Sequence, residues 1–115
     1  MSEKTSGERL DVTIRDDTEG HRYIVEVDGQ RAGMAVYHLR GGRHFFVHTE
    51  VDSEYEGKGI GKELVRYALD DVREQGGLVV PICPFFAAFI ERHPEYDEIV
   101  DQQITERINR PEFNE

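Results

Sequence analysis

The segment EYEGKGIGK, residues 54–62, has the residue types and spacing most suggestive of chemistry. Three glycines stand at alternate positions in it: Gly57, Gly59 and Gly61. Glycine lets a backbone turn tightly and approach a ligand closely, and the first N–H groups of a following helix have no partner within that helix. Such a turn binds anions, phosphate in particular, and Lys58 and Lys62 add local positive charge. The segment therefore predicts a phosphate-binding turn, and the alternative is a plain tight connection.

Two common nucleotide-binding motifs do not fit this spacing. A P-loop requires G-x-x-x-x-G-K-[ST], but Gly57 and Gly61 are only four residues apart and Glu63 replaces the hydroxyl residue of the motif. A dinucleotide-binding turn requires G-x-G-x-x-G early in a βαβ unit, and here the last glycine comes one residue too soon. If the turn binds an anion, it belongs to another class of anion site.

Cys83 is the single cysteine of the chain, which excludes an internal disulfide or a thiolate metal cluster. Most lone cysteines are small buried hydrophobic residues. Two features favour a functional role: Cys83 follows an apolar run that predicts a strand, and it precedes a helix whose N-terminus favours negative charge. Both interpretations, a structural residue and a catalytic or substrate-proximal one, stay open.

His48 is the best candidate for a general base among the five histidines. A neutral imidazole there could take a proton from an incoming ammonium group, and Glu50 is a lower-ranked alternative. The other interpretation of His48 is a hydrogen-bonded strand residue. Strict alternation predicts two faces for this strand, with Phe46, His48 and Glu50 on one and Phe45, Val47, Thr49 and Val51 on the other.

The elements that must position these residues follow from hydrophobic periodicity. Alternating apolar residues predict four antiparallel strands near residues 10–14, 23–27, 30–39 and 44–51, with a type I′ turn at Asp28-Gly29. From Gly59, apolar residues recur every three or four positions and predict a helix ending at Gly76-Gly77. Its apolar stripe consists of Ile60, Leu64, Val65, Ala68, Leu69 and Val72.

The rest of the chain predicts a buried strand over residues 78–82, a helix over 84–92 and a short C-terminal helix over 99–108. The expected order is β-β-β-β-α-β-α, an α/β fold. With 115 residues the chain has room for one domain, which we place at residues 10–108 between a flexible N-terminus, 1–9, and a polar tail, 109–115.

The composition is strongly acidic, with 24 Asp and Glu against 14 Lys and Arg, a net charge of -10. This balance disfavours nucleic acids and anionic membrane surfaces as partners, and no apolar run is long enough to span a bilayer. We expect a cytoplasmic protein, a monomer or weak homodimer, without a metal. The acidic surplus favours a cationic acceptor molecule, although it could equally serve solubility or adaptation to salt.

Four blocks of the sequence resemble the GNAT acetyltransferase superfamily, and more narrowly its small YjdJ-type branch. They are HTEV from His48, YEGKGIG from Tyr55, VPICPF from Val80 and HPEY from His93. Residues 56–61 match the pyrophosphate-binding pattern Q/R-x-x-G-x-G/A of the superfamily except at Glu56, whose carboxylate adds no positive charge. The resemblance covers about residues 10 to 100.

This resemblance implies a mixed, mostly antiparallel sheet in which the strand ending at Val51 and the strand over 78–82 run parallel and splay apart. It implies acetyl-CoA in that gap, between Cys83 and His48. The implied cofactor-binding residues are Val51, Glu56, Gly57, Lys58, Gly59, Ile60, Gly61, Lys62, Pro84 and Phe85. The expected function is acetyl-CoA-dependent transfer to a primary amine, small or on a peptide or protein. The alternatives are a CoA-binding module without catalysis and, less favoured, an interaction protein that docks through its aromatic helix.

Overall fold

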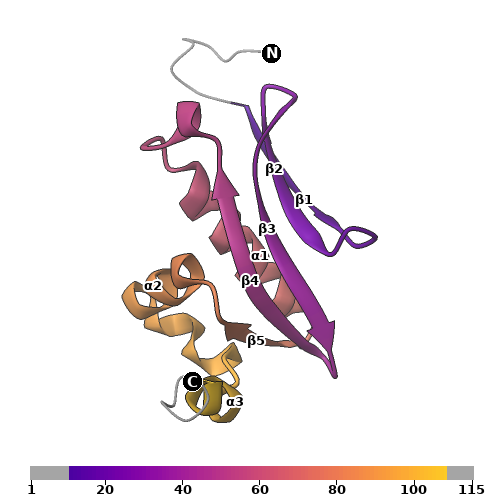
Figure 1. Cartoon of the computed structure of the whole chain (residues 1–115), viewed down its shortest axis with the longest axis vertical. Helices are drawn as coiled ribbons and strands as arrows, with labels where there is room; N and C mark the ends of the chain where they lie inside the picture. The colour runs from indigo at the N-terminus through magenta and orange to yellow at the C-terminus, as the bar shows by residue number, and fades with distance from the viewer. Residues whose placement is uncertain (1–10, 109–115) are drawn as a thin grey trace.

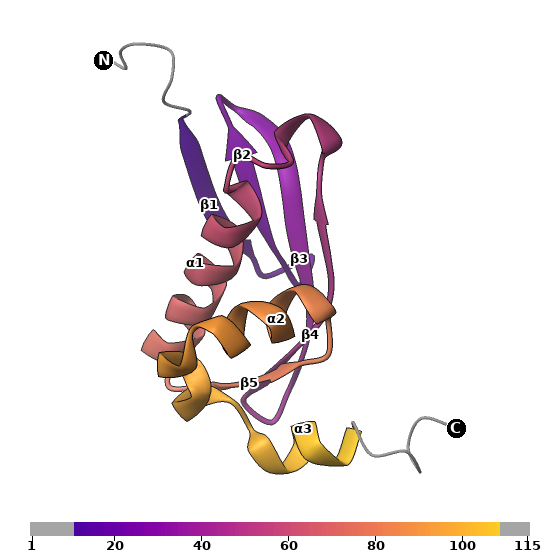
Figure 2. The same ribbon diagram turned by 90° about the vertical axis from the view of Figure 1, so that its left-hand side faces the viewer.

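The computed structural model describes residues 11–108, which form one sheet with helices packed on one of its faces (Figures 1 and 2). The sheet follows chain order and contains β1 (Val12–Asp17), β2 (Arg22–Val27), β3 (Gln30–Arg40), β4 (Arg43–Val51) and β5 (Leu78–Pro81). Neighbouring strands are antiparallel except β4 and β5, which are parallel. The mixed α/β fold and its mostly antiparallel sheet are as the sequence predicts.

The helical segments of the described region are η1 (Ser53–Tyr55), α1 (Ile60–Glu74), α2 (Pro84–Arg92), η2 (Pro94–Ile99) and α3 (Gln102–Ile108), where η denotes a 3-10 helix. None of the described helices is both long and apolar enough to cross a membrane. The flexible N-terminus and the polar tail expected from the sequence lie outside the described residues.

Turns and helix ends form where the residue types allow unusual backbone angles. Asp28 and Gly29 both have positive φ, 51° and 84°, and Val27 pairs with Gln30, so the predicted type I′ hairpin is confirmed. Gly76, with φ of 76°, follows the last turn of α1, as a glycine just after a helix commonly does.

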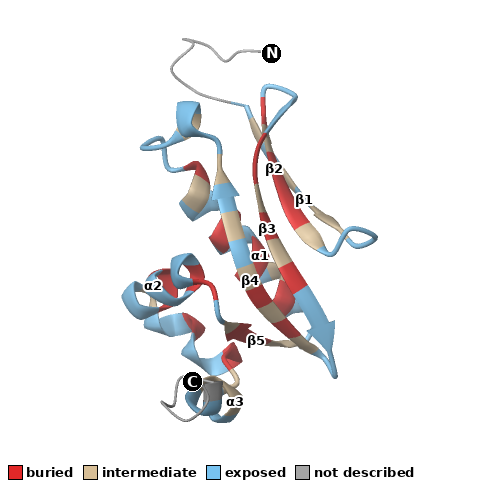
Figure 3. Ribbon diagram, in the orientation of Figure 1, coloured by how far each residue is buried: buried red, intermediate tan, exposed pale blue. Residues whose placement is uncertain are grey.

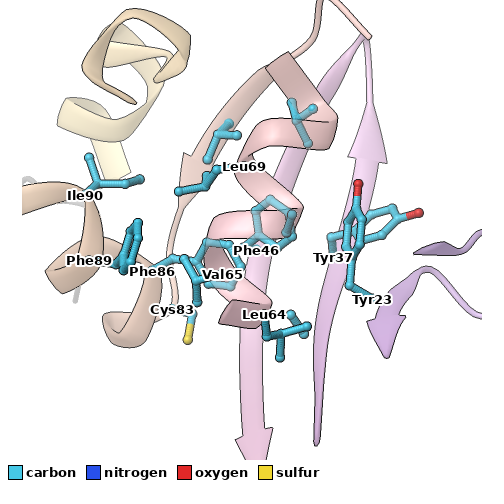
Figure 4. Close-up of a cluster of buried hydrophobic side chains, with 14 of the residues drawn as sticks. Tyr23, Tyr37, Phe46, Leu64, Val65, Leu69, Cys83, Phe86, Phe89 and Ile90 are labelled. Carbon is cyan, nitrogen blue, oxygen red and sulfur yellow. The ribbon is translucent and has the colours of Figure 1, made fainter. Parts of the chain in front are cut away.

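The core lies between the sheet and helices α1 and α2. All six residues of the predicted α1 stripe are buried, and they pack on Tyr23, Tyr37 and Phe46 of the sheet (Figure 4). Ile24, which alternation assigns to the polar side of β2, is nevertheless only 1% exposed. Its direct cross-strand neighbours Arg15 and Met34 have long side chains that can cover it on the face away from the helices.

A β-bulge in β4 overturns the predicted alternation of that strand. Val36 pairs with His48 and Tyr37 pairs with Phe46, so Val47 is an extra residue without a partner in β3. Phe46 is fully buried on the helix side, whereas His48 and Glu50 are exposed, and Figure 3 shows β4 changing from buried to exposed toward its end. The prediction that these three residues share one face is therefore wrong, because the extra residue reverses the alternation.

The C-terminal region differs from the single helix predicted over residues 99–108. The chain forms η2 up to Ile99, then Val100 makes a parallel bridge with Val79 of β5, and α3 follows. Asp101 anchors this crossing, because its carboxylate accepts a 2.6 Å hydrogen bond from Nε of Arg43 and a 3.1 Å bond from the N–H of Ile104. The short extended stretch replaces the first turn of the predicted helix.

Candidate active site

The pairing between β4 and β5 ends halfway along β4. Their parallel pairing runs only from Arg43 opposite Leu78 to Phe46 opposite Pro81. The N–H groups of Ile82 and Cys83 both donate to the carbonyl oxygen of Phe46, at 3.1 and 2.8 Å, and the chain then enters α2 with Pro84 as its first residue. The remainder of β4, residues 48–51, has no partner in β5, and its free edge offers backbone donors and acceptors to a ligand.

The predicted glycine turn connects this part of β4, through η1, to α1. Gly57 and Gly59 adopt the left-handed conformation, with φ of 81° and 79°. The first backbone bond of α1 runs from the N–H of Glu63 to the carbonyl of Gly59, at 3.1 Å. The N–H groups of Ile60, Gly61 and Lys62 precede it and have no backbone acceptor within the described residues. Three N–H donors without a backbone acceptor in this part of the chain thus gather at the positive helix end.

Beside this turn, α2 brings in a cavity of about 280 Å³ that sequence reasoning did not foresee. Its lining residues are Lys62, Phe85, Ala88, Phe89, Arg92 and His93. A Cβ on Gly61 would lie 2.5 Å from Cζ of Phe85, so the absence of a side chain there allows the ring to cover the turn. The cavity is aromatic and basic, and no carboxylate of the described residues lines it. The positions of Phe85, Phe89 and Arg92, four and three residues apart on one helix, could have indicated that these side chains line one surface.

His93 completes one wall of that cavity in a fixed orientation. Its Nδ1 donates to the carbonyl oxygen of Phe89 at 2.9 Å, and its ring stacks on the Phe89 ring with centroids 4.0 Å apart. The other ring nitrogen, Nε2, is left without a protein partner in the described region.

Cys83 is buried, 6% exposed, immediately before α2, and its sulfur lies at the border of the core cluster (Figure 4). Its Sγ is 3.2 Å from Oγ1 of Thr49, which is a hydrogen bond across the point where β4 and β5 separate. The contact between the Thr49 side chain and Cys83 was not predicted from the sequence. Strict alternation assigned Thr49 to the face of the strand opposite Phe46 and His48. The bulge at Val47 brings it to the cysteine.

His48 lies on the other side of β4 from Cys83. Its Nε2 is 2.8 Å from Oε2 of Glu50, and both side chains are more than half exposed. The structure therefore does not bring the side chains of His48 and Cys83 together, but it pairs the two candidate bases on the face without helices.

The remaining predicted ligand residues surround the turn. Val51 ends β4 and packs partly buried against the core, whereas Glu56, Lys58 and Pro84 are exposed. Glu56 is held by a bond from its own N–H to the carbonyl of Ser53, at 3.2 Å. Residues 11–108 contain no group of three or more His, Cys, Asp or Glu side chains arranged to hold a metal ion.

Residues 22–99 match a protein-family model described as GCN5-related N-acetyl-transferase. No curated protein is similar enough in sequence to count as a match. Among solved structures, the NMR structure of a GCN5-like protein from Staphylococcus aureus is similar with a TM-score of 0.60 and 19% identity, covering 76% of this chain and 86% of that one.

A second similar structure is the ribosomal-protein-S18-alanine N-acetyltransferase from Escherichia coli, with a TM-score of 0.53 and 17% identity. The match covers 76% of this chain but only 53% of that enzyme. At these identities the two structures show a shared fold, and the chain corresponds to about half of the Escherichia coli enzyme.

Proposed function

The chain belongs to the GCN5-related N-acetyltransferase family, and on that basis we propose that it binds acetyl-CoA and transfers the acetyl group to a primary amine. The observation that carries the proposal is that the N–H groups without an acceptor at the start of α1 lie beside the basic, aromatic cavity on α2. Although the chain is acidic, Lys62, Arg92 and His93 line this cavity without a carboxylate from any other described residue, which suits a ligand rich in phosphate.

In this proposal the pyrophosphate of CoA binds the N–H groups of Ile60 to Lys62, with Lys58 and Lys62 beside them. Glu56 adds no positive charge, so the helix end must supply most of the attraction. The exposed ring of Phe85 offers a stacking surface to the adenine, and Arg92 and His93 can pair with a further phosphate.

The free edge of β4 provides the path for the pantetheine arm. Its backbone groups near Thr49 and Val51 can hydrogen-bond the two amides of that arm as a neighbouring strand would. This places the thioester near the separation of β4 and β5, next to Cys83. A backbone N–H there stabilises the oxyanion that forms when the amine attacks.

The transfer itself requires an amine with a free electron pair. In this proposal His48, paired with Glu50, accepts the proton of the incoming ammonium on the open face. The amine nitrogen then bonds to the thioester carbon, the C–S bond breaks, and CoA leaves as its thiol with a proton from the attacking nitrogen. The products are an acetylated amine and CoA.

A matched pair of glycine variants tests the proposal. Gly59 and Gly76 stand at opposite ends of α1, both have φ near the same value, 79° and 76°, and a Cβ at either would meet nothing within 4 Å. Aspartate at either position costs about 1 kcal/mol of folding stability through backbone strain. Only Gly59→Asp puts a carboxylate at the phosphate-binding helix end, so we expect it to weaken acetyl-CoA binding by more than about tenfold while Gly76→Asp leaves it unchanged.

Calorimetric titration of acetyl-CoA measures both affinities, and release of CoA thiol with a panel of primary amines measures transfer. Equal affinities in the two variants, or no binding to the wild type, would contradict the proposed site. Binding without thiol release for any amine would leave a CoA-binding module and contradict catalysis.

A further inference from the structure

A second cavity, of about 450 Å³, lies at the β3–β4 hairpin, apart from the α1–α2 site. It is lined by His21, His38, Leu39, Arg40, Phe45, Val47 and Ile82. Phe45 pairs directly with His38, and their chain neighbours Phe46 and Tyr37 are buried on the helix side, so alternation directs Phe45 and His38 to the open face of the sheet.

The cavity adjoins the position proposed for the thioester. Val47 is the extra residue of the bulge and is followed by His48, whose side chain is exposed on the same open face. Ile82 directly precedes Cys83, and the N–H groups of both residues bond to Phe46 where β4 and β5 separate. A molecule in this cavity could therefore direct one end toward the separation of the two strands.

The charges of this cavity are opposite to those of the whole chain. In the part of the chain that the structure describes, its ionisable lining residues are His21, His38 and Arg40, with no carboxylate, although the chain has a net charge of -10. Within residues 11–108, the side chains of His38 and Arg40 make no hydrogen bond or ion pair. The walls are apolar, and Leu39 and Ile82 are unusually exposed for their type, at 51% and 43%. The unpaired guanidinium of Arg40 and the imidazole of His38, which can donate a hydrogen bond, stand beside exposed apolar walls, and this combination complements an amphiphilic anion.

We propose that this cavity binds the acetyl acceptor, and that the acceptor is a primary amine with an apolar or aromatic body and a carboxylate at its far end. This inference rests on the proposed acetyltransferase function. The apolar walls bury the body, and Arg40 with His38 pairs with the carboxylate. It reverses the expectation of a cationic acceptor, because local charges within a few ångströms outweigh a net charge spread over the surface.

Three primary amines on the same benzyl frame, which differ in the charge at the para position, test the proposal: 4-(aminomethyl)benzoate, benzylamine and 1,4-bis(aminomethyl)benzene. We expect kcat/KM for CoA release to fall in that order, by about fivefold between the anionic and the neutral amine, the upper range for one exposed ion pair. Arg40→Gln should remove most of this preference without changing acetyl-CoA affinity. Arg31→Gln is the matched control, since it removes the same charge from the other end of β3.

Backbone amide shifts of labelled protein, titrated with 4-(aminomethyl)benzoate, give a readout independent of turnover, with changes expected at His38, Val47 and Ile82. Turnover of all three amines at equal rates, or a preference that Arg40→Gln leaves intact, would overturn the inference while the proposed function stands. Binding at these amides without turnover would support the ligand class and contradict acetyl transfer. Neither binding nor turnover would contradict both.

Discussion

His44 is buried in the core, only 4% exposed, and its Nδ1 has no hydrogen-bond partner among residues 11–108. Its ring lies 4.7 Å from the ring of Tyr37, whose hydroxyl donates to Asp16 at 2.7 Å. Burial lowers the pKa of His44 below its ordinary value, and the nearby carboxylates of Asp16 and Asp71 oppose this shift only in part. The native state therefore holds this imidazole in its neutral form.

This burial predicts that the protein loses stability below neutral pH. The pKa of His44 is lower in the folded than in the unfolded chain, so below about pH 6.5 the unfolded chain binds the extra proton. The free energy of unfolding should fall as the pH falls through this range, by at most about 1.4 kcal/mol per pH unit for one proton.

Urea unfolding between pH 5.5 and 7.5 measures that slope, in a range above the lowered pKa values of Asp17 and Asp101. His44→Phe should flatten it, because the substitution removes the titrating group and keeps an aromatic ring. An unchanged slope in His44→Phe would show that the proton binds elsewhere.

Helix α2 contacts both the sheet and the glycine turn through the adjacent rings of Phe86 and Phe85. Phe86 is fully buried and stacks on Phe46 of β4, with ring centroids 4.1 Å apart and planes at 11°. Phe85 is 41% exposed and covers Gly61 of α1. One ring fixes the helix, and the other belongs to the candidate ligand surface.

Alanine substitutions should separate these two roles. Phe86→Ala should destabilise the fold by about 3–5 kcal/mol, the usual cost of removing a buried phenylalanine. Phe85→Ala should change stability by less than about 1 kcal/mol, because the ring is partly exposed, yet weaken acetyl-CoA severalfold. Urea unfolding and calorimetric titration give the two quantities. If the binding free energy of acetyl-CoA in Phe85→Ala falls by no more than the free energy of unfolding, Phe85 does not belong to the ligand surface.

The sequence predicted the elements whose signal is local. The stripe from Ile60 to Val72 repeats at helical period, and the glycine turn lies within a few consecutive residues, so both were visible. The bulge at Val47 was not, because the run HFFVHTEV shows no break in its β-forming character. Thr49 and Arg92 were missed for a related reason: each reaches the candidate site through packing between elements distant in the sequence.

For the whole molecule, the net charge of -10 and the basic ligand surfaces act over different distances. At about 10 mM salt the screening length is about 30 Å, so an approaching CoA anion is repelled by most of the chain, whereas at 150 mM it is about 8 Å and only local charges matter. We expect the association rate of a fluorescent CoA to rise with salt over this range, measured by stopped flow.

The double variant Lys58→Gln and Lys62→Gln serves as the control for that measurement. It should bind more slowly at every salt concentration, because both local cations are gone and the long-range repulsion is greater. An association rate that falls with added salt in the wild type would mean that the lysines already dominate at long range.

The extra residue in β4 also determines which changes of chain length this protein tolerates. Since side chains in a strand alternate with a period of two, deletion of Val47 would remove the offset and restore regular alternation, with Phe46 still opposite Tyr37 and His48 still opposite Val36. His48 would stay on the open face, and Thr49 would stay beside Cys83. The strand can therefore lose this one residue without exchanging the side chains on its two faces.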